Sequence, residues 1–362
     1  MAANFAQWGN DLYTGKRSYN VVGARRKFFA VSAGIILICV LILIFRGFNL
    51  GIEFRGGSEF RVTTSEQDTT IAEEAFNSVV PGRDAQVVTI GTNAVRIQTT
   101  ELTEDQVGAV REALAEAYGV EAGQDVTSSS IGASWGSDVS NKTIRGAVIF
   151  LLLVTLAMTL YFRAWRMAVS ALAALLHDLI VTVTVYAIVG WELSPATLIG
   201  FLTVLGYSLY DTVVIFDKVR ENTANVLDQS QYTYAEAANL AVNQTMVRSI
   251  NTSVVALLPV GSILFIGAFL LGAGTLQDIS LALFVGMAAG TYSSVFLATP
   301  MEVALRQYES KLKAHTAKVL TARAAAGGVA PGAVSRLTPI GALRPGAHQG
   351  QAAQPRRKRP VR

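Results

Sequence analysis

Six long apolar stretches constrain the fold of this chain more than any other feature of its sequence. A helix that crosses a bilayer needs about 20 mostly apolar residues, and the stretches approach or exceed that length. Of the 362 residues, 51% are hydrophobic and only 15% are charged, a balance typical of membrane proteins. We therefore predict a polytopic α-helical membrane protein with six transmembrane helices, at residues 28–45, 144–162, 168–190, 196–216, 250–271 and 279–299.

Basic residues predict the orientation of these spans, because Lys and Arg favour the cytoplasmic side of a membrane. They occur in alternate connections and at both ends, namely in residues 1–27, at Arg163 and Arg166, in residues 217–249, and in residues 300–362, which hold 12 of the 30 Lys and Arg. The short connections 191–195 and 272–278 contain none. We therefore expect both termini and the loop 217–249 to be cytoplasmic, and residues 46–143 to lie outside.

The segment 46–143 is predicted to form a separate α+β domain. Residues 51–143 carry 15 Asp and Glu against 6 Lys and Arg, a balance of −9, whereas the rest of the chain is basic. Local patterns predict, in order, a strand at 51–63, a helix at 68–80, strands at 85–91 and 94–99, a helix from Thr103 to Tyr118, and a strand at 126–131. This β-α-β-β-α-β order is that of a ferredoxin-like domain.

Asp211 is a carboxylate inside the fourth apolar stretch, about two helical turns before Asp217. A charge inside a bilayer costs roughly 2.5 to 3.5 kcal/mol on insertion scales, so such residues usually have a function. Asp211 shares a helix face with Gly200 and Tyr207 and should face other helices. We interpret Asp211 as a functional site, with a head-group contact that only fixes topology as the alternative, and Asp217 as a solvated charge at the helix end.

Arg248 lies at the beginning of the fifth span, where Asn251 and Thr252 follow on the same helix face. A long arginine side chain can reach inward, here toward Asp211, to form an ion pair. The alternative is an arginine that snorkels to the cytoplasmic surface and only orients the span. The sequence leaves both interpretations open.

His177 and Asp178 lie inside the third span, and both side chains can carry protons. The alternative for this pair is a hydrogen-bonded contact between packed helices. Together the polar residues of the spans form a candidate proton path, comprising Asp211, Arg248, His177, Asp178, Tyr207, Asn251 and Thr252.

Glycines mark two kinds of predicted contact. Small residues spaced by four in the membrane allow helices to approach closely, and paired glycines in a strand indicate a bulge or a close backbone contact. The predicted helix-packing glycines are Gly206, Gly286 and Gly290, and the predicted hinge or domain motif outside the membrane is Arg55, Gly56 and Gly57.

Motifs of common enzymes are missing from the sequence. It contains no Walker loop, no HExxH pair and no Gly-x-Ser-x-Gly elbow. With three His and one Cys, a metal cluster of the usual kind is nearly excluded. Tyr210-Asp211 matches half of the intramembrane aspartyl protease signature, but the second aspartate motif is absent. We predict a protein that is not an enzyme and that has no metal or other cofactor.

Four stretches together resemble the SecF branch of the SecD/SecF family, within the RND superfamily. They are residues 48–57, His177-Asp178, residues 206–222 and residues 245–253, and the resemblance covers about residues 20 to 305. Two positions depart from the family pattern: Glu53 stands where Asp is usual, and Tyr210 stands where Asn usually precedes the membrane Asp. The change at Tyr210 puts the hydrogen bonding of Asp211 in question.

The resemblance implies a role in protein export at the bacterial cytoplasmic membrane. Members pair with SecD, associate with the SecYEG channel, and use the proton motive force to assist late translocation of unfolded pre-proteins, while SecA performs the ATP-driven step. Asp211 and Arg248 match the intramembrane proton path of the family. The alternative function is half of an RND-type proton-driven transporter for lipid or small molecules.

The basic, Ala- and Pro-rich part of the tail 300–362 lies outside the resemblance. It is rich in Ala, Gly and Pro and closes with Arg356-Arg-Lys-Arg359, so we predict a disordered, basic, cytoplasmic segment. Such a tail can contact anionic membrane lipid or ribosomal RNA, but fixing the topology is the simpler role, and we expect no specific nucleic acid partner.

Overall fold

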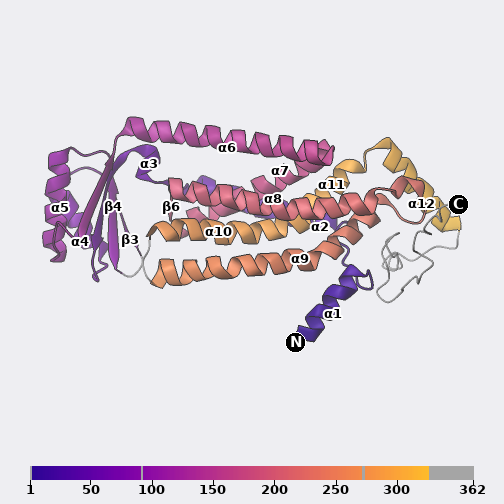
Figure 1. Ribbon diagram of the computed structural model, residues 1–362. Helices are drawn as coiled ribbons and strands as arrows, with labels where there is room; N and C mark the ends of the chain where they lie inside the picture. Colours follow the sequence, from indigo (N-terminus) through magenta and orange to yellow (C-terminus); the bar gives the residue numbers. More distant parts are fainter. Residues whose placement is uncertain (1, 91–92, 271–273, 326–362) are drawn as a thin grey trace, which may run out of the picture.

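The computed structural model describes residues 2–90, 93–270 and 274–325. Six of its helical segments are long and apolar enough to cross a membrane, which confirms the predicted number of spans. These helices lie side by side, with the sheet domain at one end and the helices α1 (Ala2–Tyr13) and α12 (Ser310–Ala325) toward the other (Figure 1). The six segments are Arg25–Arg46, Ala133–Phe162, Trp165–Val189, Pro195–Asp228, Tyr234–Gly267 and Leu276–Arg306.

The spans are built from helices that in part extend beyond the predicted boundaries. They are α2 (Arg25–Arg46), α6 (Ala133–Phe162), α7 (Trp165–Val189), α8 (Pro195–Thr223), α9 (Tyr234–Ser262) with the π-helix η2 (Ile263–Leu270), and α10 (Gly274–Ser293) with the π-helix η3 (Ser294–Ala298). Capping boxes at Ser194 and Thr233 fix the beginnings of α8 and α9. Of these helices, α7, α8 and α10 are the most buried and form the centre of the bundle.

Close contacts between α8 and α10 depend on small residues. A Cβ added to Gly286 would lie 2.4 Å from Cγ1 of Val204, and one added to Gly290 would lie 2.9 Å from Cβ of Ser208. Both predicted packing glycines therefore lie at contacts between these two helices. The prediction for Gly206 is wrong, because this glycine is exposed and a Cβ there would meet nothing within 4 Å. The contact instead uses Gly200, which faces Ala282.

The sheet domain contains β2 (Gly57–Thr63), α4 (Thr69–Val79), β3 (Ala85–Ile90), β4 (Ala94–Thr99), α5 (Glu104–Tyr118) and β5 (Val126–Ile131). The strands pair in the order β3-β4-β2-β5, and every pair is antiparallel. Inward side chains of the sheet meet α4 and α5 in a core that includes Phe60, Ile97, Phe76 and Leu114. Thr103 begins α5 with the capping box that the sequence predicts.

Two backbone contacts join this domain to the bundle. Strand β1 (Asn49–Leu50), after α2, pairs in parallel with β6 (Glu192–Leu193), which connects α7 and α8. Beyond the short helix α3 (Ile52–Arg55), Gly56 has φ +78° and lies against α6, where a Cβ would be 2.6 Å from Cα of Ala133. A Cβ at Gly57 would lie 2.4 Å from the carbonyl oxygen of Thr99. The predicted close backbone approach at these glycines is thus confirmed.

The connection between the fourth and fifth spans is largely helical: α8 continues to Thr223, a 3₁₀ turn η1 covers Val226–Asp228, and α9 begins at Tyr234. The tail contains more helix than the sequence predicts. In the tail, α11 (Thr299–Arg306) and α12 (Ser310–Ala325) are helical, and residues 326–362 lie outside the described residues. Near the other terminus, α1 spans Ala2–Tyr13.

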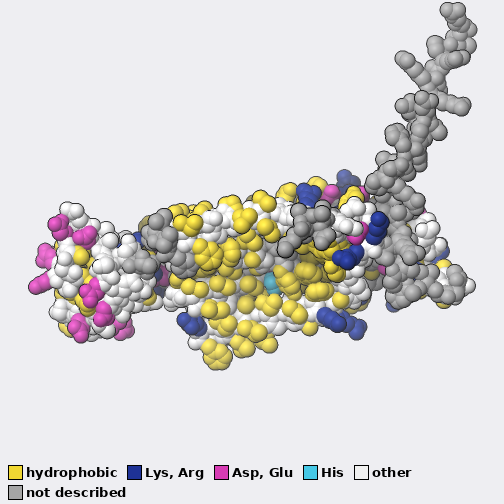
Figure 2. Space-filling model, turned by 90° about the horizontal axis from the view of Figure 1, so that it is seen from below, with side chains coloured by type: hydrophobic (Ala, Val, Ile, Leu, Met, Phe, Trp, Pro, Cys, Tyr) yellow, Lys and Arg dark blue, Asp and Glu magenta, His cyan; other side chains and the backbone are white. Residues whose placement is uncertain are grey.

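The distribution of side chains on the surface follows this architecture. Hydrophobic side chains cover the helical middle of the molecule, acidic ones gather on the sheet domain, and basic ones lie mostly toward the opposite end (Figure 2). An apolar belt between two polar ends is what a membrane-embedded helix bundle requires, because hydrocarbon cannot solvate charge.

Candidate functional site

Asp211 is buried at the centre of the bundle, with 7% of its surface exposed. The Ser249 hydroxyl of α9 donates to its Oδ1 at 2.7 Å, and the Ser294 hydroxyl of η3 donates to its Oδ2 at 2.6 Å. One carboxylate from α8 therefore links three elements, and each of its oxygens has its own hydroxyl donor. Hydrogen bonds to an ionised group are among the stronger ones in proteins.

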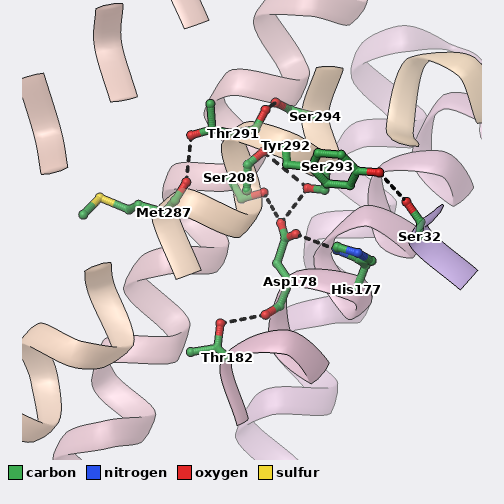
Figure 3. Close-up of polar contacts among 11 residues, drawn as sticks. Ser32, His177, Asp178, Thr182, Ser208, Met287, Thr291, Tyr292, Ser293 and Ser294 are labelled. Carbon is green, nitrogen blue, oxygen red and sulfur yellow. Dashed lines mark hydrogen bonds and ion pairs between the residues drawn. The ribbon is translucent and has the colours of Figure 1, made fainter. Parts of the chain in front are cut away.

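Asp178 of α7 forms a second buried carboxylate site and is fully inaccessible. Its Oδ2 accepts from Ser208 at 2.7 Å and from Ser293 at 2.8 Å, and its Oδ1 lies 3.2 Å from Nδ1 of His177 (Figure 3). The Thr182 hydroxyl donates to the backbone oxygen of Asp178 at 2.7 Å. The predicted His177–Asp178 pair is thus brought together, with serines from two other helical elements around it.

Serines connect the two carboxylates to one network. Ser293 and Ser294 are consecutive, yet one donates to Asp178 and the other to Asp211. Ser208, which donates to Asp178, lies one helical turn before Asp211 on α8. The consecutive serines fall at the junction of α10 and the π-helix η3, and π-helical turns often occur at functional sites. Any change at one carboxylate therefore acts on the helices that hold the other.

The network continues toward the first span. The rings of His177 and Tyr292 are 6.0 Å apart, and the Tyr292 hydroxyl lies 3.1 Å from the Ser32 hydroxyl of α2. Nε2 of His177 is buried and has no hydrogen-bond partner. Because α2 leads directly into β1 and the sheet domain, this chain of contacts links the buried carboxylates to the entry of that domain.

Of the two interpretations that the sequence leaves open for Arg248, the ion pair with Asp211 does not form. Arg248 is exposed on the side of the bundle, and its Nη2 donates to the Tyr210 hydroxyl at 3.1 Å. Ser249, the next residue, is the one that faces Asp211, and consecutive helical positions differ by about 100° in direction. Tyr210, the unusual residue beside Asp211, therefore binds the arginine instead of the carboxylate.

Three further predicted residues do not reach the carboxylates. Asn251 is exposed, and the Thr252 hydroxyl donates to the backbone oxygen of Arg248 at 2.5 Å. Tyr207 is half-buried, and within the described part of the chain it makes no hydrogen bond to Asp178 or Asp211. The sequence reasoning missed Ser208, Ser249, Ser293 and Ser294. Their signal was a hydroxyl inside an apolar run, at helical spacing from an acid or on a facing span.

This arrangement can bind and release protons. Buried carboxylates titrate by exchanging a bound proton for hydrogen bonds, and hydroxyls can donate to a carboxylate or accept from a carboxylic acid. Among the described residues, no group of three or more His, Cys, Asp and Glu side chains is arranged to hold a metal ion. The chemistry that the site itself offers is proton transfer between hydrogen-bonded groups.

Comparisons with known proteins agree with this architecture. Residues 110–308 match the family described as "Protein export membrane protein SecD/SecF, C-terminal", and residues 41–68, which include Gly56 and Gly57, match the "SecD/SecF GG Motif". The chain is 43% identical over 316 residues to the protein translocase subunit SecF of Streptomyces coelicolor, covering 87% of this chain and 84% of that one. The SecF of Mycobacterium tuberculosis strain H37Rv is 41% identical over 321 residues, covering 86% and 72%.

A solved structure shows the same fold. It is the crystal structure of SecDF from Thermus thermophilus, titled a translocon-associated membrane protein, which aligns with a TM-score of 0.71 and 26% identity. The alignment covers 81% of this chain but only 39% of the longer SecDF chain. Family match, identity and fold agree, and this chain belongs to the SecD/SecF family, among the protein translocase subunits named SecF.

Proposed function

We propose that this subunit of the Sec pathway works with a SecD partner and uses the proton motive force to promote late steps of pre-protein translocation through SecYEG. The observation that carries this proposal is the pair of buried carboxylates, Asp178 and Asp211, to which the consecutive residues Ser293 and Ser294 donate. A polar network of this kind is costly inside a bilayer, and its usual use there is ion or proton transport. The role is mechanical rather than catalytic, and the ATP-driven step is left to SecA.

Protonation provides a driving force of suitable size. One proton that crosses about 100 mV releases about 2.3 kcal/mol. When Asp211 is ionised, Ser249 and Ser294 donate to it; once it is protonated, one hydroxyl must rotate and accept instead. The contacts among α8, α9 and η3 then differ between the two states, so a proton biases one helix arrangement over the other.

The exposed surface around Arg248 supports the proposal that a second membrane protein packs against this side of the bundle. Arg248, Tyr210 and Asn251 lie on the outside of the bundle, within a surface that includes the exposed Val255 and Leu258. An arginine facing hydrocarbon is unfavourable, so this face is better covered by protein. The unmatched 61% of the SecDF chain, which remains beyond the 39% aligned, leaves room for such a half. We propose SecD as its occupant and Arg248 as an interface residue of the proton path.

The sheet domain is proposed to be ferredoxin-like and extracytoplasmic. Its four antiparallel strands in the order β3-β4-β2-β5 and its two helices support the first assignment. Its negative balance, against the basic opposite end, supports the second. Both termini are then cytoplasmic, in the bacterial cytoplasmic membrane. In this arrangement the joint at Gly56 and Gly57 acts as a hinge that transmits helix movement to the domain.

The test is Asp211→Asn, which keeps the size of the side chain and removes its titration. We expect loss of the proton-dependent stimulation of export in inverted membrane vesicles, with association of SecD unchanged. The matched control is Asp217→Asn, since Asp217 is an exposed acid farther along the same helix. Normal gradient-dependent stimulation in Asp211→Asn would refute the proposal, and a stable complex with other partners but not with SecD or SecYEG would refute the Sec role.

A further inference from the structure

A second pair of carboxylates lies outside the membrane site, where the sheet domain meets the α7–α8 connection. Gln98 of β4 is almost fully buried, and its side-chain nitrogen Nε2 donates to Oε2 of Glu59 and to Oε2 of Glu192, each at 2.6 Å. Glu59 belongs to β2 of the sheet, whereas Glu192 belongs to β6 between the spans and is only 6% exposed. One amide thus ties the sheet to the bundle through two acids.

The hydrogen bonds of this cluster leave one acceptor, Oε1 of Gln98, without a donor. An amide side chain has a donor end and an acceptor end. Both hydrogens of Gln98 Nε2 are used by carboxylates, and its Oε1 is buried without any partner. Buried polar atoms in folded proteins are nearly always paired. If Glu192 is protonated, it can donate to Oε1 of a turned Gln98 while Nε2 donates to Glu59, so that the orphaned amide oxygen gains a donor.

The surrounding charges favour the same proton. The charged groups that face Glu192 are Arg96 of β4, Glu59 of β2, Glu53 of α3 and Asp278 of α10. Arg96 Nη2 lies 3.1 Å from Oε1 of Glu192 and is one cation among four acids. Burial raises the pKa of Glu192 above its usual 4.5, and Glu59 and Glu53 add to the rise, while Arg96 and Gln98 oppose it.

We propose that Glu59, Gln98 and Glu192 share a single bound proton and that this proton fastens the sheet domain to the α7–α8 connection. The pairing of β1 with β6 and the contact of Gly56 with α6 are made by backbone atoms, which do not titrate. Uptake is a plain proton transfer from water to a carboxylate. A carboxyl that binds its proton more tightly in the docked domain stabilises docking at low pH, and that stabilisation is lost as the pH rises through its docked pKa.

This inference deepens the proposed function, on which it rests only for the side of the membrane. With the domain outside, an acidic exterior holds it docked, and a local rise in pH releases it about the Gly56 joint. The contact would thus set how far the domain can move at a given external pH.

The test measures the position of the domain by pulsed electron spin resonance in lipid nanodiscs. Spin labels on Glu112→Cys of α5 and Ser262→Cys of α9, both exposed, report across the contact in a Cys39→Ala background. We expect one narrow distance distribution at about pH 5 and, at about pH 8, a second population at least about threefold larger than at pH 5. Glu192→Gln supplies the missing donor permanently, so its distribution should stay narrow at both pH values.

Variants and controls separate the possible outcomes. Gln98→Leu should show the second population at both pH values, whereas Glu116→Gln, an exposed acid on α5, should behave like wild type. If Glu192→Gln does not fold, Glu59→Gln gives the same expected result. A wild-type distribution that does not change with pH, or a pH response that persists in the folded Glu192→Gln or Glu59→Gln chain, overturns the inference. Asp211→Asn should retain the response, so failure of the export role is distinguishable.

Discussion

The molecule contains two carboxylate pairs that polar side chains hold: the membrane pair, Asp178 and Asp211, and the outer pair, Glu59 and Glu192, where the sheet domain meets β6. The hydrogen-bond donors differ between the two pairs. Around Asp178 and Asp211 they are serine hydroxyls, whereas between Glu59 and Glu192 the donor is the amide of Gln98. A hydroxyl rotates freely and can donate or accept, whereas an amide has a fixed donor end and a fixed acceptor end.

This difference determines how each pair responds to a proton. The serine network can satisfy ionised and protonated carboxylates alike, at the cost of rotating hydroxyls and adjusting helices, which suits a group that must cycle. The amide matches one protonation state only and leaves an unpaired atom in the other. Under the proposed function, the membrane pair suits repeated binding and release of a proton, whereas the Glu59–Glu192 pair favours one protonation state.

The largest expected effect tests whether the two membrane carboxylates work as one unit. Asp178→Asn should reduce proton-dependent export stimulation at least about tenfold, a barrier change of about 1.4 kcal/mol, because Ser293, which donates to Asp178, is directly followed by Ser294, which donates to Asp211. The double variant with Asp211→Asn should be no worse than either single variant. The control is Thr182→Val, which removes only a bond to a backbone oxygen. Multiplying losses in the double variant would show two independent sites.

The next largest effect is expected from removing one of the serine hydroxyls that donate to the carboxylates. Ser294→Ala should lower the free energy of unfolding by about 1.5 to 3 kcal/mol, the usual range for a hydrogen bond to a charged group, while Ser294→Thr, which keeps the hydroxyl, should lose less. Thermal unfolding in nanodiscs measures this. Ser262→Ala is the control, since that exposed hydroxyl bonds only to the Leu258 carbonyl. Equal loss in the Ala and Thr variants would argue for packing rather than hydrogen bonding.

A smaller effect is expected at the outer pair. Gln98→Glu places a third acid between Glu59 and Glu192 and removes the amide that donates to both. We expect the docked-to-released ratio to fall about tenfold near pH 8 and much less near pH 5, where added protons replace the lost donor. The same spin-label distances measure it. A variant that docks equally well at both pH values would show that an amide is not required.

The smallest effect concerns Asp68 of the sheet domain, a carboxylate whose pKa is shifted down, whereas that of Glu192 is shifted up. Asp68 caps α4, and hydrogen bonds from Thr70 hold the pKa of Asp68 below its usual 3.8. Its contribution to stability is therefore present above pH 3.8 and is lost as the pH falls through the lowered value. In Asp68→Asn this acid-side loss should disappear from pH-dependent unfolding curves, while the neutral-side behaviour of Glu192 stays. If Asp68→Asn changed the stability at both acid and neutral pH, the two pH dependences would not arise from separate groups.

Much of the fold could be predicted because its signals are local. Apolar length gave six spans, period-two and helical patterns gave the strand and helix order, and an acid inside an apolar run marked Asp211 and Asp178. The partner of Asp211 could not be obtained this way. Choosing Arg248 over Ser249 is a difference of one position, or about 100° around α9, and charge drew attention to the wrong side of the helix.

The remaining errors have a common physical origin. Ser293 and Ser294 become partners of the carboxylates only because α10 packs against α7 and α8, which no single stretch reveals. Gly206 has the composition of a contact residue but lies on the open side of α8, whereas Gly200 lies on the packed side. Sequence patterns identify faces; which face meets which neighbour depends on the assembled bundle.

The π-helix η3 has a consequence for everything that follows it. A π-turn holds one residue more than an α-turn, so η3 sets the rotational phase of α11, where Glu302 is buried between Tyr234 and Arg306. If η3 reverted to an α-helix, α11 would turn by about 100° relative to α10, and those contacts could not be kept. The turn that carries Ser293 and Ser294, the donors to the two membrane carboxylates, therefore also sets the alignment of α11.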